Sequence, residues 1–478
     1  MQILKNFLYN LSYQILVLIL PLITVPYVSN ILGAKGVGDY AFTFANTQYF
    51  ILFGMVGITL YGNRQIAYIR ENKEKLKNTF YSIYLVQLIT MSISSILFLL
   101  FVFIFNEGLY RSLYLVQGIN ILAALIDISW LLIGLEKFKK TVVRNTLVKL
   151  ISFISIFVFV KDINDLVKYT MILALANLLG NITFWFYIPN IFGFKNIRFD
   201  KLSSHLRAAI ALFIPQIAIQ VYILLSKTLL GILTDTTQVG YYENSQKLIN
   251  IALTVATAIG TVMMPKIANT VATGDMKKVK YYIKNSFFFM NLISVPLTFG
   301  LLGIAKELSP WFFGKEFEGI ETLLSISSLT ILAISWSNVF GTQLLVPLNK
   351  TKEFTLSVTA GAIVNLSLNL IFLKNMGSIG ACITTTLAEI VVTVTQMHIL
   401  RKFLNIKEII KSIVIFFPSA IAMLIVIRVI GSVMGAKIVT TMIQVSVGGI
   451  IYLGTLFVLY KLIYKQNIVE YIRGMIKT

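Results

Sequence analysis

The sequence has few of the residues that enzymes and secreted domains commonly rely on. Its one cysteine, Cys382, excludes a disulfide within the chain. Its two histidines, His205 and His398, lie far apart and lack the spacing of metal ligands. We find neither a nucleotide-binding loop nor a zinc motif. The sequence therefore argues against redox and zinc chemistry.

Charged residues are also scarce. They make up 13% of the 478 residues, whereas 57% are hydrophobic and the mean hydropathy is +0.82. Soluble chains are about a quarter charged and need polar residues to cover their surface. The net charge of +21 does not indicate nucleic acid, because the basic residues form short clusters between apolar runs. The composition indicates an integral membrane protein.

Long apolar runs recur along the whole chain. A bilayer core of ~30 Å requires roughly 20 helical residues per crossing. The first run carries Pro21 and Pro26 without a small-residue cleavage site, so we interpret it as a retained span rather than a signal peptide. The runs predict an all-α integral membrane fold of about 14 transmembrane helices, at 8–32, 41–62, 79–105, 112–135, 146–161, 166–190, 208–233, 239–264, 286–305, 321–346, 354–373, 377–400, 412–433 and 438–460.

The loops between these runs differ in basic content. With the N-terminus inside, the inside loops and tails hold 29 of the 41 Lys and Arg residues, and the outside loops hold eight. Cytoplasmic loops carry the excess of Lys and Arg in membrane proteins. The sequence therefore predicts a plasma-membrane protein with both termini in the cytoplasm and no separate soluble domain.

A short motif occurs twice. Ile31-Leu32 is followed by Val37-Gly38-Asp39-Tyr40, and Ile232-Leu233 is followed by Val239-Gly240-Tyr241-Tyr242. Six predicted spans separate the copies, which gives two repeats of the same orientation with a site between them. A chance match of a turn motif is the alternative. The repeat predicts two pseudo-symmetric six-helix lobes around a central cleft, at 1–200 and 201–405, followed by two further helices and a tail at 406–478.

Polar residues follow one face of two neighbouring predicted helices. Charged groups inside a bilayer are expensive and usually face a cavity or a partner. The stripes predict a hydrated, substrate-binding cleft, although the threonines could instead bond neighbouring helices. The eighth span carries Glu243, Lys247, Asn250, Thr254, Thr257 and Thr261, and the seventh carries Gln216, Gln220 and Lys227.

Four further charged residues lie within or beside the spans. Asp127 and Glu389 are candidates for binding a coupling proton or Na⁺, and structural pairing is the alternative for each. Arg428 could neutralise a lipid phosphate, or it could snorkel or pair with a carboxylate. Arg64 is a second candidate for substrate contact, or a basic residue of the cytoplasmic end.

Several segments, taken in order, resemble the polysaccharide biosynthesis (Wzx-type) flippases. No one segment decides the match, but their order and spacing cover both predicted lobes. The segments are Pro26 through Leu32-Gly33-Ala34 and Gly36-Val37-Gly38 to Tyr40-Ala41, Tyr61-Gly62-Asn63-Arg64, Asp127-Ile128-Ser129-Trp130 leading to Gly134-Leu135-Glu136-Lys137-Phe138, Val239-Gly240-Tyr241-Tyr242-Glu243-Asn244, Phe313-Gly314-Lys315-Glu316-Phe317, Gly341-Thr342-Gln343, Pro347, Gly361 to Asn369, and Gly377-Ser378-Ile379-Gly380-Ala381 to Glu389.

This resemblance implies a transporter rather than an enzyme, in a superfamily that includes multidrug antiporters and lipid II flippases. The implied cargo is an oligosaccharide on undecaprenyl pyrophosphate, moved to the outer leaflet by alternating access for capsule, O-antigen or exopolysaccharide assembly. Membrane lipids, a polymerase and glycosyltransferases are the implied partners, with no cofactor beyond a coupling Na⁺ or H⁺. One departure is that Ser226, not an Asp, precedes Lys227.

Two other functions remain open from the sequence. A drug antiporter would favour an acidic cleft, which Lys227 and Lys247 oppose and Asp127 and Glu389 allow. A membrane polysaccharide polymerase would carry a large outer loop with catalytic arginines, and the predicted outer loops hold few arginines. The sugars, the coupling ion and the oligomeric state are not encoded in any pattern that we recognise.

Overall fold

A computed structural model describes residues 2–188, 192, 197–411, 413–465 and 470 of the chain. Every regular element of these residues is a helix. They form two compact units, Met1–Gly240 and Tyr241–Thr478. The units therefore divide at Gly240, within the first turn of one helix, whereas the predicted lobes divide after residue 200. The six-helix lobes remain a prediction.

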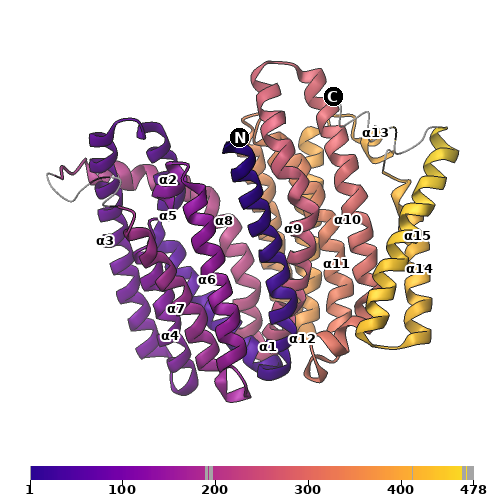
Figure 1. Cartoon of the computed structure of the whole chain (residues 1–478), viewed down its shortest axis with the longest axis horizontal. Coiled ribbons are helices and arrows are strands. Elements are labelled where there is room, and N and C mark those ends of the chain that lie inside the picture. Colours follow the sequence, from indigo (N-terminus) through magenta and orange to yellow (C-terminus); the bar gives the residue numbers. More distant parts are fainter. Residues whose placement is uncertain (1, 189–191, 193–196, 412, 466–469, 471–478) are drawn as a thin grey trace. The chain divides into compact units, whose positions relative to one another are not determined.

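The first unit is a bundle in which α3, α4, α6, α7 and α8 run alongside one another (Figure 1). Helix α8, the seventh predicted span, packs against α1, α2 and α3, so it belongs to this unit. The helices are α1 (Gln2–Met55), α2 (Ile58–Ile69), α3 (Lys73–Phe105), α4 (Gly108–Leu125), α5 (Ser129–Gly134), α6 (Phe138–Phe159), η1 (Ile163–Asp165), α7 (Leu166–Trp185) and α8 (Leu202–Leu233).

The second unit contains the remaining helices. Helix α10 packs against α11, α14 and α15 and is the most connected element of this unit. The helices are α9 (Thr236–Ala272), which begins in the first unit, α10 (Met276–Phe312), η2 (Lys315–Phe317), α11 (Ile320–Ser337), the π-helix η3 (Asn338–Leu345), α12 (Thr351–Leu400), α13 (Ile406–Lys411), α14 (Phe416–Met434) and α15 (Ile438–Tyr464).

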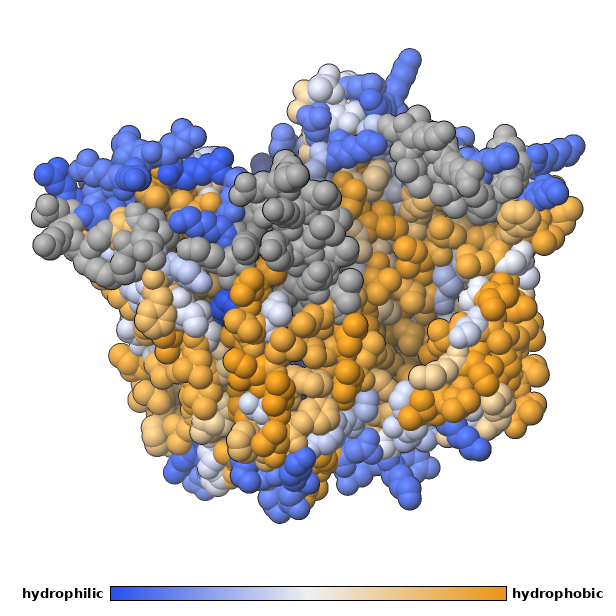
Figure 2. Space-filling model, in the orientation of Figure 1, coloured by the Kyte–Doolittle hydropathy of each residue, from blue (hydrophilic) through white to orange (hydrophobic). Residues whose placement is uncertain are grey.

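The surface of each unit matches a bilayer environment. Figure 2 shows hydrophobic residues in a band along the middle of the helices and hydrophilic residues at both ends. Eleven helices of the described chain are long and apolar enough to cross a membrane. The all-helical integral membrane fold is thus confirmed, whereas the number of fourteen crossings remains a prediction.

Helix α12 is a hairpin of two arms. Fifty residues at ~1.5 Å per residue would extend far beyond a ~30 Å bilayer core. Gly377, with φ 53° and ψ −133°, breaks the helix, and hydrogen bonds then join its arms. Thr384 Oγ1 donates to Asn369 Oδ1 at 2.5 Å, and Gln396 Nε2 donates to Ser357 Oγ at 3.2 Å. The arms correspond to the predicted eleventh and twelfth spans.

Helix α1 is broken in a similar way by Gly33, with φ 66° and ψ −178°. Its first arm packs on α6, where the ring of Tyr27 stacks on Phe157 at 4.1 Å. Its second arm packs on α3, where Ser94 Oγ donates to the Phe50 carbonyl at 2.6 Å. The predicted second span differs from the structure, because left-handed Val56 and Gly57 separate α1 from α2.

The two copies of the repeated motif contact each other within the first unit. A Cβ atom on Gly38 would overlap the Thr236 carbonyl, and one on Gly240 would overlap the Ala34 carbonyl. Backbones that approach this closely are characteristic of small residues at membrane helix interfaces. The shared glycines therefore allow α1 and the start of α9 to touch.

The predicted fifth span, 146–161, is shorter than the helix observed. Helix α6 begins at Phe138 and includes Arg144, which the sequence assigned to a cytoplasmic loop. The Arg144 guanidinium donates to Asn181 Oδ1 at 2.7 Å and lies 4.7 Å from the centre of the Phe184 ring. These contacts, which hydropathy does not detect, keep a charged side chain inside the bundle.

We expect Gly38→Ala and Gly240→Ala to destabilise the protein. Each added methyl group meets backbone, which cannot rotate away, and overpacking of this kind costs about 1–3 kcal/mol. Both glycines lie in the first unit, whose unfolding can be followed by the loss of helical circular dichroism. The midpoint temperature of this loss should fall by several degrees in both variants.

Gly454→Ala is the matched control for these variants. No heavy atom lies within 4 Å of a Cβ placed at this helical glycine. Alanine favours a helix by about 1 kcal/mol over glycine, so the midpoint should stay or rise. Equal midpoints for Gly38→Ala and the control would contradict the close contact.

Candidate functional site

The polar stripe of α9 begins with an ion pair. Lys247 Nζ lies 3.6 Å from Glu243 Oε1, one helical turn away. The Lys247 side chain is 27% exposed and that of Glu243 13% exposed, so the ammonium group is the more accessible member of the pair. Lys247 thus gives the stripe a positive charge that Glu243 of the same helix partly balances.

The rest of this stripe lies on the surface of the second unit. Asn250, Thr254 and Thr261 are exposed, and Thr257 is half-buried. The three threonine hydroxyls donate to carbonyls of α9 itself, at 2.7 to 2.8 Å. In the described structure these hydroxyls thus bond their own helix, and both roles considered for them, lining a cleft and bonding a neighbouring helix, remain predictions.

The stripe of α8 belongs to the first unit. Lys227 is half-buried and Gln220 is exposed, whereas the side chain of Gln216 lies outside the described residues. Next to Lys227, Thr228 Oγ1 donates to Asn46 Oδ1 at 3.0 Å, which links α8 to α1. The structure thus places Lys227 in one unit and Lys247 in the other.

Asp127 lies in the break between α4 and α5. Its Oδ1 accepts a hydrogen bond from the Ser129 amide at 2.8 Å, so it caps the short helix α5. Gln87 of α3, fully buried, donates to the carbonyls of Asp127 and Ala124, both at 2.9 Å, and accepts from Trp130 Nε1 at 3.1 Å. These bonds hold the broken backbone and its carboxylate in place.

A chain of amides joins this break to α7. Asn177 Nδ2 donates to Asn120 Oδ1 at 3.0 Å, and Asn181 Nδ2 donates to the Ala123 carbonyl at 2.8 Å. Neither α7 residue was predicted from the sequence. The sequence did contain a signal for them, because two asparagines four residues apart in an apolar run lie on the same face of a helix.

Glu389 is half-buried on the second arm of α12. The same hairpin carries a fully buried polar cluster in which Asn369 Nδ2 donates to Asn365 Oδ1 at 2.8 Å. Neither asparagine was selected from the sequence. Both roles proposed for Glu389, ion binding and structural pairing, remain predictions.

The two arginine candidates have different surroundings. Arg428 is half-buried in α14 and donates to the Leu302 carbonyl of α10 at 2.7 Å. Arg64 is exposed in α2 and donates through Nε to Tyr68 Oη at 3.1 Å. Substrate contact remains a prediction for both side chains.

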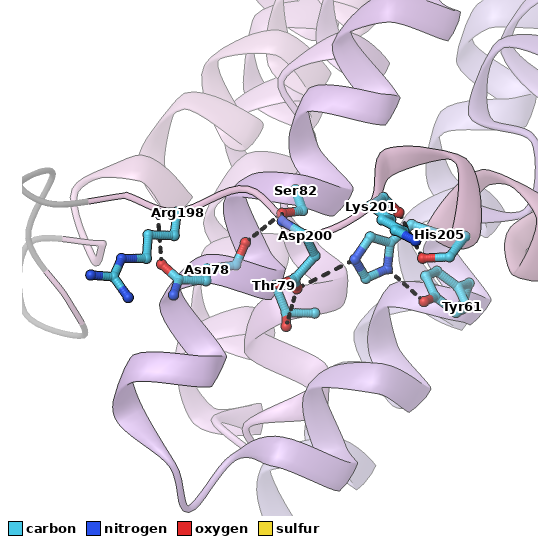
Figure 3. A network of polar contacts seen from close by, with 9 residues as sticks. Tyr61, Asn78, Thr79, Ser82, Arg198, Asp200, Lys201 and His205 are labelled. Atoms are coloured by element: carbon cyan, nitrogen blue, oxygen red, sulfur yellow. Dashed lines mark hydrogen bonds and ion pairs between the residues drawn. The ribbon is translucent and has the colours of Figure 1, made fainter.

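A second polar network anchors the chain that leads into α8 (Figure 3). His205 Nδ1 shares a hydrogen bond of 2.7 Å with Tyr61 Oη of α2, and its Nε2 lies 3.5 Å from Asp200 Oδ2. Thr79 of α3 donates to the same carboxylate oxygen at 3.0 Å, and Ser82 Oγ accepts from the Asp200 amide at 2.8 Å. His205 therefore helps to fix α8 to its own unit.

Two pockets of the second unit border α10 and α14. One, of about 640 Å³, lies at the end of the unit where α10, η2 and α14 meet and includes Lys306, Glu307 and Lys315. The other, of about 410 Å³, has an apolar lining from α10, α14 and α15 that includes Pro296, Met423 and Tyr452.

A family model described as "Polysaccharide biosynthesis protein" matches residues 3–271, more than half of the chain. The chain belongs to this family. That assignment confirms the resemblance drawn from the motifs, which occur in both units.

Two relatives and one solved structure are also similar to this chain. A "Putative O-antigen transporter" of Escherichia coli (strain K12) is 26% identical over 400 residues, which cover 83% of this chain and 96% of the relative. A "Probable low-salt glycan biosynthesis flippase" of Haloferax volcanii is 26% identical over 179 residues, 37% of this chain and 38% of the relative. A solved structure, "Lipid II flippase MurJ, inward closed conformation", has a TM-score of 0.79 at 16% identity, covering 96% of this chain and 99% of that one. This family member is a multi-pass membrane transporter, not an enzyme.

We expect Gln87→Leu to destabilise the first unit of this family member. The substitution removes a donor and an acceptor that are both fully buried, and each group left unsatisfied costs about 1–3 kcal/mol. The midpoint temperature for the loss of helical circular dichroism should fall by several degrees. Thr254→Val, which removes an exposed hydroxyl bonded to its own helix, should leave this midpoint almost unchanged.

Proposed function

We propose that the protein moves oligosaccharides linked to undecaprenyl pyrophosphate from the inner to the outer leaflet of a bacterial plasma membrane. The observation that carries the proposal is the similarity to the O-antigen transporter, which extends over 83% of this chain. Alternating access of the predicted lobes would carry the sugars past the membrane centre. Capsule, O-antigen or exopolysaccharide assembly is the pathway class.

The energetics of this cargo explain why a polar stripe is needed. An isolated ionised group transferred to a medium of low dielectric constant costs tens of kcal/mol. Lys227 and Lys247 would offset the charge of the pyrophosphate, and the exposed hydroxyls and amide of α9 would replace water around the sugars. The lipid tail needs no enclosed path, because it can remain in hydrocarbon.

The orientation follows from the basic loops. We place the end of each unit that carries the basic loops, together with both termini, in the cytoplasm. Outward movement of an anionic head group is then favoured by ~2.3 kcal/mol per charge per 100 mV of inside-negative potential.

Coupling to Na⁺ or H⁺ through Asp127 or Glu389 would add to this force. Glycosyltransferases before the step and a polymerase after it are the expected partners.

The apolar pocket of the second unit is consistent with a lipid-linked cargo. Its volume of about 410 Å³ is lined mainly by apolar side chains of three helices. A polyprenyl chain and an acyl chain of the bilayer share the chemistry that this lining accepts. The pocket therefore supports a lipid-linked substrate without distinguishing among lipids.

Reconstitution of the purified protein into liposomes tests the function. With labelled undecaprenyl-pyrophosphate oligosaccharide, wild type should expose the glycolipid in the opposite leaflet. Lys247→Ala and Lys227→Ala should each slow this transfer at least about tenfold, corresponding to about 1.4 kcal/mol of lost stabilisation. Lys247→Arg should keep most of the rate because it keeps the charge.

Lys402→Ala is the matched control for the transport assay, because this lysine is exposed between α12 and α13. Its rate should equal that of wild type. If wild type moves no glycolipid but exchanges soluble organic cations for Na⁺ or H⁺, the protein is a drug antiporter instead.

The orientation has a separate test. In a Cys382→Ala background, Thr273→Cys places an exposed thiol between α9 and α10, and Ala436→Cys places one between α14 and α15. On intact cells, an impermeant maleimide should label Cys at 436 at once and Cys at 273 only after permeabilisation. The reverse pattern would show that the basic loops face outward.

A further inference from the structure

Glu307 is a buried carboxylate that none of the transport arguments uses. It lies one turn before the C-terminal end of α10, is 6% exposed, and forms part of the wall of the 640 Å³ pocket. Within the described residues, its one hydrogen bond comes from Gln444 Nε2 of α15, at 3.2 Å. The carboxylate therefore lies between helix α15 and the 640 Å³ pocket.

Helix α14 leaves room for this carboxylate. A Cβ atom on Gly431 would overlap the Glu307 carboxyl group and come within 2.7 Å of Gln444 Nε2. The side chains of Glu307 and Gln444 thus occupy the space that any other residue at this position would fill. Three helices, α10, α14 and α15, meet at the carboxylate.

Two oxygen atoms of α15 are buried without a hydrogen-bond partner in the described structure. They are Gln444 Oε1 and Thr440 Oγ1, on residues that are both fully buried. The two protons of the Gln444 amide are already used, because Nε2 also donates to the Ile427 carbonyl at 3.0 Å. Buried polar groups are normally satisfied, so these oxygens have room for a hydrogen-bond donor or a cation.

The register of the helices places Gln444 opposite Glu307 and Thr440 one turn away. Trp311, one turn after Glu307, donates to Thr441 Oγ1 at 3.0 Å, while Glu307 itself accepts from Gln444. Helices α10 and α15 are therefore antiparallel here, and Thr440 precedes Gln444 by one turn on α15. The indole of Trp311, bonded to the residue next to Thr440, can report on a change at this end of the helices.

The charges around the site favour a cation. Glu307 forms no ion pair with a described residue, and the guanidinium of Arg428 donates to the Leu302 carbonyl. The pocket is lined by three acidic residues, Glu307, Glu318 and Glu321, against two basic ones, Lys306 and Lys315, a net charge of −1. A buried ionised carboxylate without a counter-charge is costly, so a cation that reaches it is bound favourably.

We propose that Glu307, Gln444 and Thr440 bind Na⁺, which enters through the 640 Å³ pocket. Carboxylate, amide and hydroxyl oxygens are ligands for hard cations, and one carboxylate with neutral oxygens balances a single positive charge. Divalent ions of this class use more ligands and usually several carboxylates. The site is separate from the stripes of α8 and α9 and does not depend on the identity of the transported lipid.

The test is Na⁺ binding by the purified full-length protein, at constant ionic strength maintained with choline chloride. NaCl should raise the midpoint for labelling of Cys382 and change the tryptophan fluorescence, whereas KCl should do neither at equal concentration. Trp311→Phe should remove the fluorescence change and keep the thermal shift. Glu307→Gln should weaken the apparent Na⁺ affinity at least about tenfold, or about 1.4 kcal/mol.

Two variants keep the test decisive. Thr440→Val preserves shape and should weaken Na⁺ binding even if Glu307→Gln does not fold. Glu318→Gln, a change in the same pocket outside the proposed ligand set, should bind Na⁺ as wild type does. An unchanged Na⁺ response in Glu307→Gln or Thr440→Val would overturn the site, as would stabilisation by acid alone without preference for Na⁺. Glycolipid transfer is not measured, so failure here is distinct from failure of the proposed function.

Discussion

Hydrocarbon offers no hydrogen-bond partners, and most of the internal structure of this protein follows from that constraint. A helix satisfies its own backbone, but every break in a helix exposes carbonyls that need other donors. At the break between α4 and α5, one glutamine side chain supplies this need by donating to Ala124 and Asp127. At the Gly377 break, hydrogen bonds between the arms of α12 hold the two halves together. The polar core residues are therefore concentrated where the helices are interrupted or cross.

The sequence predicted the class of fold because a bilayer fixes both the length and the composition of a crossing helix. It also singled out Gly38 and Gly240, which the structure places in mutual contact. Hydropathy did not predict the interruption at Val56 and Gly57 or the inward extension of α6 to Phe138. Both depend on partners from other helices, and a window along one segment contains no information about them.

The same limit applies to the candidate site. The spacing of four and three placed the α9 residues on one face, and the structure finds most of that face exposed. The spacing could not show that Lys247 pairs with Glu243, or that Asp127 caps α5. Asn177 and Asn181 were missed because isolated polar residues in an apolar run look alike until their partners on distant segments are known. Glu307 was missed because it follows the predicted span 286–305 and was assigned to an outside loop. Family membership was accessible from sequence because ordered motifs survive when overall identity is low.

The threonine hydroxyls of α9 have a chemical consequence for any molecule that passes them. A hydroxyl has one proton to donate, and each of these protons is already donated to a carbonyl of the same helix. The hydroxyl oxygens of these threonines therefore present a column of lone pairs toward the surface. Sugars carry many hydroxyl protons, which can be donated to any of these oxygens in turn without a fixed partner. In the proposed transport, such a column would accept hydrogen bonds from sugars of different stereochemistry, and discrimination would be left to the charged residues at its end.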